Sequence, residues 1–138
     1  LLDRQSKYDF ALAQPARTHN SYTDHRIVEQ VDGLDARRTR FVEIGPVVSL
    51  RRDAAAILLP FDEDCGMGWG LDFLWPVAIE SAGLKMGIID ATPVAHALRP
   101  AAKSYGLDEA LVHMQAYLED KPHLTPQQAM VELERHAI

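Results

Sequence analysis

The chain has 138 residues, 47% of them hydrophobic, and its 14 basic and 20 acidic side chains give a net charge of −6 and a pI near 5.4. This length supports a single core that needs neither metal nor disulfides to hold it together, and no apolar run approaches the ~18 residues of a membrane-spanning helix. The lone cysteine, Cys65, excludes an internal disulfide framework and a zinc knuckle, so we expect a reducing compartment and a cytoplasmic location.

The negative charge is concentrated in the second part of the chain. Residues 1–60 carry nine basic and eight acidic groups, whereas residues 61–138 carry five basic and twelve acidic groups. One basic cluster stands out, with few aromatic residues around it: Arg37, Arg38, Arg40, Arg51 and Arg52. An acidic surface repels a phosphate backbone, so no nucleic-acid partner is expected.

The first sixty residues read mainly as short strands. The expected strands cover residues 10–13, 24–30, 40–44 and 47–50. Gln14-Pro15 closes the first of them, and Gly45-Pro46 separates the last two. A helix of one to two turns is predicted over residues 53–59, ending at Pro60.

Helices are predicted around one buried strand in the rest of the chain. Apolar spacing predicts a helix over residues 71–82, kinked by Pro76 and ended by Gly83. Its apolar face comprises Leu71, Leu74, Trp75 and Ala78. The continuous apolar run 86–89 predicts a strand buried on both faces. Two helices should finish the chain, one over 108–120 capped by Asp108 and one from a Thr125-Pro126-Gln127-Gln128 capping box running toward Met130 and Leu133.

This alternation predicts an α/β or α+β domain with a mixed sheet. We expect residues 40–50 and 86–96 to form neighbouring strands of that sheet. The helix that begins near Leu71 should pack on them, because both apolar runs need its apolar face to leave water.

The segment GMGWGLD, residues 66–72, is the strongest candidate for chemistry. Its glycines permit close approach of the backbone, the Trp69 indole offers a flat stacking face, and the helix dipole stabilises Asp72 in the first turn. Such a set suits a sugar ring, whose hydroxyl could lose its proton to the carboxylate. The alternative is that Asp72 only caps the helix and Trp69 only packs.

Longer motifs resemble a known family. FVEIGPVVSLRRDAAAILLPFDEDCGMGWGLD and the following MGIIDATPVAH resemble the second half of a GT-A-fold glycosyltransferase domain. In β-1,4-galactosyltransferases a strand and short helix precede a WGWGxED loop, which is followed by a strand ending in a metal-binding histidine. The chain is also similar to glycosyltransferase-like proteins of plants and bacteria that share four segments. These are Gln14-Pro15-Ala16, Val42-Glu43-Ile44, Gly68-Trp69-Gly70-Leu71-Asp72, and Ile89-Asp90-Ala91 with His96.

The resemblance, which spans residues 10–100, implies the acceptor-side half of a GT-A-like mixed sheet with flanking helices and a C-terminal helical pair. Residues 1–105 would form a partial catalytic domain, and residues 106–138 a helical extension packed on it. The implied activity is transfer of a sugar from a nucleotide-sugar donor to a saccharide or other hydroxyl acceptor, by a retaining or an inverting route.

The resemblance also implies residue roles. Asp72 would be the general base, and His96, with Asp90 as a possible partner, would bind Mn²⁺ or Mg²⁺. The substrate would be bound by Glu43, Gly45, Gly68, Trp69 and Gly70.

Two departures from the family pattern bear on these roles. Leu71 replaces the first acid of the WGxED motif. Asp62-Glu63-Asp64 lies too late in the chain to be the DxD motif that holds metal and nucleotide. Together with a start that lacks methionine, this suggests a fragment. The alternative function is a non-catalytic carbohydrate-binding or scaffold domain.

Overall fold

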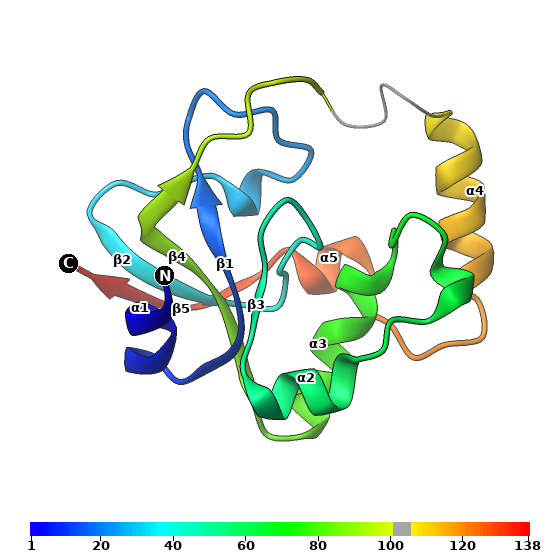
Figure 1. Cartoon of the computed structure of the whole chain (residues 1–138), viewed down its shortest axis with the longest axis horizontal. Helices are drawn as coiled ribbons and strands as arrows, with labels where there is room; N and C mark the ends of the chain where they lie inside the picture. Colours follow the sequence, from blue (N-terminus) through cyan, green and yellow to red (C-terminus); the bar gives the residue numbers. More distant parts are fainter. Residues whose placement is uncertain (101–105) are drawn as a thin grey trace.

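The computed structural model describes residues 1–100 and 106–138, which form a five-stranded mixed sheet with helices on both faces (Figure 1). The strands are β1 (Phe10–Arg17), β2 (Leu34–Thr39), β3 (Ser49–Leu50), β4 (Lys85–Val94) and β5 (Glu132–Ala137). Their spatial order is β3-β1-β4-β2-β5. Only β1 and β4 pair in parallel, so the carboxyl ends of these two central strands lie at the same edge of the sheet.

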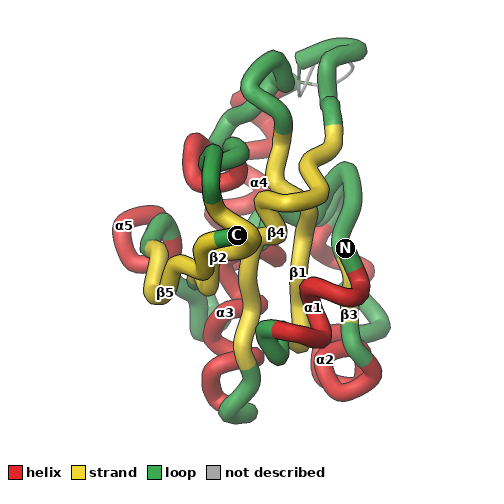
Figure 2. Tube along the Cα trace, turned by 90° about the vertical axis from the view of Figure 1, so that its left-hand side faces the viewer, coloured by secondary structure: helices red, strands yellow, loops and turns green. Residues whose placement is uncertain are grey.

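The helices are divided between the two faces of the sheet. They are α1 (Leu2–Lys7), α2 (Arg52–Leu58), α3 (Leu71–Ser81), α4 (Leu107–Leu118) and α5 (Pro126–Ala129), with 3₁₀ turns η1 (Arg26–Val28) and η2 (Glu63–Cys65). Helix α1 covers one face, and α2 and α3 cover the other (Figure 2). None of the helices in the described ranges is long and apolar enough to span a membrane.

Each face of the sheet has its own core. The larger one packs the α3 side chains Trp75 and Ile79 against Met86 and Ile88 of β4. The smaller one lies under α1 and comprises Phe10, Ala13, Ala36 and Ile89, with Leu1 and Tyr8 at its border. Neighbouring residues of β4 therefore enter opposite cores, which confirms that the 86–89 run is buried on both sides.

Four local predictions from the sequence are confirmed. Helices 53–59 and 71–82 appear as α2 and α3. Gly83 ends α3 at a φ of +71°, and its N–H donates to the Glu80 carbonyl at 2.9 Å. The Thr125 hydroxyl accepts from the Gln128 N–H at 3.3 Å while the Gln128 side chain accepts from the Thr125 N–H at 2.9 Å, which completes the capping box.

Several strand predictions in the first half are wrong. Residues 24–30 contain the η1 turn instead of a strand, and residues 40–44 have no strand pairing. Phe41 and Val42 are both fully buried in the larger core, whereas adjacent strand residues would point to opposite faces. The first strand also continues past Gln14-Pro15 to Arg17.

The neighbours of β4 are therefore β1 and β2, and not residues 40–50. Of that segment only β3 joins the sheet, where it pairs with β1. Helix α3 does pack on the sheet, but Phe73 and Ile79 are buried where Leu74 and Ala78 were expected to be, and those two are only half-buried.

The expected C-terminal helical pair is also wrong. Helix α5 ends at Ala129, and residues 132–137 form edge strand β5, antiparallel to β2. Two ion pairs connect β2 to β5: Arg37 with Glu132 at 2.8 Å and Arg38 with Glu134 at 2.6 Å. Gly106, and not Asp108, is the N-cap residue of α4. The domain boundary expected at residue 105 lies outside the described residues.

Candidate active site

A cleft of about 800 Å³ opens at the carboxyl ends of β1 and β4. Open α/β sheets commonly bind ligands at this edge. Its walls come from the end of β1, from segments 24–25, 43–46 and 96–100, from the start of α3, and from the α4 and α5 helices. The structure places Glu43, Gly45, Trp69, Gly70, Asp72 and His96 in this one cleft, and it leaves Gly68 and Asp90 outside its lining.

Asp72 is the second residue of α3 and only 7% exposed. Within the described part of the chain, its buried Oδ1 atom has no hydrogen-bond partner. Burial, and then the nearby charge of Glu43, raises the pKa of Asp72 from 3.8 to about 7, although N–H groups at the helix start act in the opposite direction. The fold thus holds a carboxyl group that can gain or lose a proton near neutral pH.

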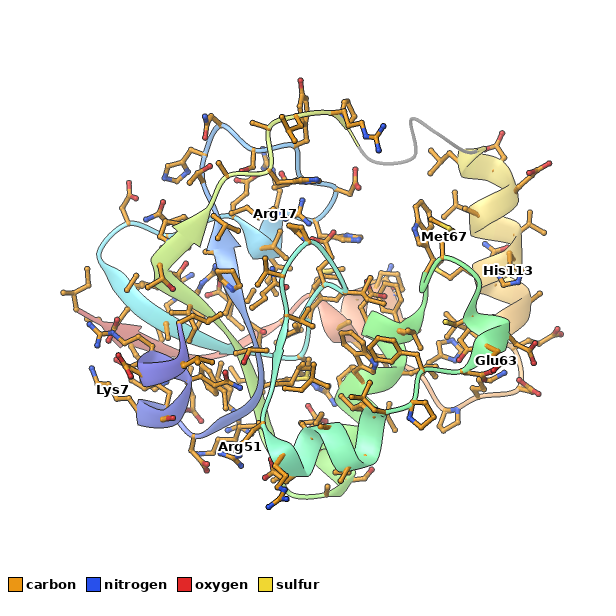
Figure 3. All side chains as sticks on the ribbon, in the orientation of Figure 1. Lys7, Arg17, Arg51, Glu63, Met67 and His113 are labelled. Atoms are coloured by element: carbon orange, nitrogen blue, oxygen red, sulfur yellow. The ribbon has the colours of Figure 1, made fainter. Side chains whose placement is uncertain are left out.

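Arg17, which Figure 3 labels, is the last residue of β1 and part of the polar lining of the cleft. Its Nη1 atom donates to the Tyr22 carbonyl and to His96 Nδ1, both at 2.8 Å. Its Nη2 atom donates to the Glu43 carboxylate and, at 2.8 Å, to the Gly45 carbonyl. A single buried guanidinium therefore holds together the end of β1, the segment 43–46 and the loop after β4.

Glu43 is the second carboxyl group of the cleft. Its backbone N–H donates to Gln14 Oε1 at 2.5 Å, and its side chain pairs with Arg17. Burial raises the pKa of Glu43 to about 7 and outweighs the opposing effect of the Arg17 charge. The Glu43 charge in turn raises the pKa of Asp72.

His96 is held by hydrogen bonds and is not free to bind a metal. Its backbone N–H donates to Ser21 Oγ at 2.9 Å, and its carbonyl accepts from the Tyr22 N–H at 2.8 Å. An arginine can only donate, so His96 Nδ1 is the acceptor in the contact with Arg17, and Nε2 carries the proton of the neutral ring. Both ring nitrogens are then committed, which leaves no lone pair for a metal.

Asp90 is a structural residue. Its fully buried carboxylate pairs with Arg37 at 2.9 and 3.0 Å and accepts from the Val31 N–H at 2.9 Å. Residues 1–100 and 106–138 contain no group of three or more His, Cys, Asp or Glu arranged to hold a metal. His96 and Asp90 therefore do not fit a Mn²⁺ or Mg²⁺ site.

The glycines of GMGWGLD shape the loop. Gly68 has a φ of +83°, and a Cβ atom there would lie 2.5 Å from Ile44 Cδ1. Gly70, the N-cap residue of α3, has a φ of +99°, and a Cβ atom would lie 3.1 Å from Met114 Cγ. These positions need glycine because of backbone conformation and the close approach of α4. In Figure 3 the same loop, with Met67, runs along the part of α4 that carries His113.

Two parts of the cleft are not evident from the sequence. Arg17 directly follows the QPA segment, but nothing in a single sequence tells a buried strand-end arginine from an exposed one. The apolar residues of α4 and α5 look like ordinary core positions until the fold brings them to the cleft.

Comparisons with known proteins assign this chain to no family. No protein-family model, no curated protein and no solved structure matches the chain.

Proposed function

We propose that this chain carries the acceptor side of a GT-A-like glycosyltransferase, with Asp72 as the general base. The observation that carries the proposal is the buried Asp72 carboxyl group, with an unpartnered oxygen and a pKa of about 7, in the wall of an 800 Å³ cleft. A base with a pKa near the working pH combines a substantial ionised fraction with enough basicity to take a proton.

The proposed reaction joins an acceptor hydroxyl to a sugar. The hydroxyl proton passes to the Asp72 carboxylate as the acceptor oxygen forms a bond to the anomeric carbon of the donor. The bond from that carbon to the diphosphate oxygen breaks, and its electron pair leaves with the nucleoside diphosphate. Asp72 then returns the proton to water.

The neighbours of Asp72 suit this role. The Trp69 side chain lines the same cleft, where an indole can cover the apolar face of a sugar ring. Glu43 is held by Arg17 in the same wall, where it raises the pKa of Asp72 and thereby the basicity of its carboxylate.

The test is the substitution Asp72→Asn, with Asp108→Asn as the matched control. Both aspartates are second residues of a helix in the sequence Gly-Leu-Asp, but Asp108 is exposed and lies outside the cleft lining. Nucleoside diphosphate release would be followed with a panel of nucleotide-sugar donors and saccharide acceptors. We expect Asp72→Asn to lower acceptor-dependent turnover by about 10²–10⁴-fold and Asp108→Asn to leave it unchanged.

Two results would count against the proposal. Wild-type turnover in Asp72→Asn would make Asp72 a helix-capping residue. Saccharide binding that weakens in Trp69→Ala, without transfer from any donor, would favour the non-catalytic carbohydrate-binding domain.

A further inference from the structure

The cleft has two chemically different walls. One wall is polar and contains Arg17, Glu43, Asp72 and His96. Another part of the lining comes from α4 and α5, and every described lining residue after position 106 is apolar: Leu107, Leu111, Met114, Pro126 and Met130. A site that bound only a free sugar would leave this second wall without a matching group.

Helix α4 explains how the apolar wall arises. Leu107, Leu111, Met114 and Leu118 follow a helical spacing of four, three and four residues and so share one face. The C-terminal end of this stripe packs against the start of α3. Leu118 is only 6% exposed, and its Cγ would lie 3.2 Å from a Cβ atom placed on Gly70. The beginning of the stripe stays uncovered, because Leu107 is 50% and Leu111 37% exposed.

This uncovered half of the stripe is continuous with the Asp72 site. Gly70 touches α4 and immediately precedes the first turn of α3, so the helix that carries the apolar wall is held beside the carboxyl group. A ligand with a hydroxyl group at Asp72 therefore has α4 within reach of whatever group is attached to it. A cleft of about 800 Å³ has the size of a small-molecule site.

We propose that the acceptor is an amphiphile: a hydroxyl compound whose hydrocarbon group lies against the α4–α5 wall while its hydroxyl faces Asp72. This inference rests on the proposed function for the role of Asp72. The hydrocarbon group removes Leu107 and Leu111 from water, and its binding free energy grows with the area it covers.

The test is a series of alkyl β-glucosides, from methyl to octyl, used below their micelle concentrations and followed by isothermal titration calorimetry on the intact protein. The dissociation constant should fall about fourfold for each methylene that becomes buried, and octyl should bind at least tenfold more tightly than methyl. Leu111→Gln should flatten this dependence on chain length.

Val112→Gln is the control, because Val112 is the next residue of α4 and 66% exposed but does not line the cleft. It should keep the chain-length dependence, and both variants should keep the wild-type circular dichroism spectrum. Equal affinity for methyl and octyl glucosides overturns the inference. So does an equal effect of the two substitutions, which would mean that the alkyl chains adsorb elsewhere.

The two proposals can fail separately. Nucleotide release with unsubstituted sugars tests Asp72 without any alkyl group, whereas the glucoside series tests the apolar wall without a donor. Transfer that depends on Asp72 but shows no alkyl preference would remove only the amphiphilic acceptor.

Discussion

The Asp72 carboxyl group is buried at a position that stabilises its ionised form poorly, so the stability of the protein should depend on pH. The pKa of Asp72 is raised from 3.8 to about 7. Between about pH 4 and pH 7 the folded protein therefore keeps a proton on Asp72 that the unfolded chain has lost. The unfolded state binds fewer protons in this window, so the free energy of unfolding falls as the pH rises through it. The full loss is on the order of 4 kcal/mol above pH 7.

Asp72→Asn should remove this loss of unfolding free energy at high pH, because asparagine does not ionise. The variant should gain stability relative to the wild type as the pH rises from 4 to 8, as measured by urea unfolding across that range. Asp108→Asn provides the reference, because this exposed aspartate has no burial of its carboxylate to relieve. A constant difference between Asp72→Asn and wild type at all pH values would show that Asp72 ionises normally in the folded protein.

Among the elements, β4 depends on a glycine near its start. Gly87 lies between β1 and β2, and a Cβ atom there would be 2.4 Å from the Arg37 carbonyl oxygen and 2.4 Å from the Phe10 ring. The carbonyl belongs to the backbone of the paired strand and cannot move without breaking the sheet. Gly87→Ala should therefore destabilise the protein by about 2–4 kcal/mol.

Thermal unfolding of Gly87→Ala and Gly45→Ala would check this. Gly45 has no positive φ, and among the described residues no atom outside its two chain neighbours lies within 4 Å of its Cβ position, so alanine should change stability there by less than about 0.5 kcal/mol. Equal melting temperatures for the two variants would mean that β1 or β2 can shift to make room.

At the scale of the whole molecule, the C-terminal strand β5 forms one edge of the sheet. Strand β5 pairs with β2 and brings Glu132 to the buried guanidinium of Arg37. Truncation after Val131 would expose the edge of β2 and leave Arg37 with one carboxylate fewer. We expect a loss of at least about 3 kcal/mol of unfolding free energy, because breaking a buried ion-pair network alone costs this much.

Truncation after Ala137 is the matched control, since it removes only Ile138, which is 89% exposed. Urea unfolding of both truncated proteins decides the point. If the two unfold at the same denaturant concentration, residues 132–137 do not contribute to the stability of the sheet.

Local signals in the sequence were sufficient for much of the molecule. Helices α2 and α3, the Gly83 terminus, the Thr125 capping box and the doubly buried strand β4 follow from propensity, capping and apolar runs that lie within about ten residues. The family resemblance implied site roles for Asp72 and His96, and both residues line the cleft.

The remaining features depend on partners distant in sequence. Strands β2 and β5 are rich in charge because they stabilise each other and β4 through ion pairs, with Arg37 contacting Asp90 and Glu132, so hydrophobic alternation could not reveal them. The unpartnered Asp72 oxygen, the engagement of His96 by Arg17 and the apolar wall of α4 arise only when segments up to a hundred residues apart meet at the edge of the sheet. Burial and hydrogen-bond partners are properties of the packed chain, and they determine what each of these side chains can do.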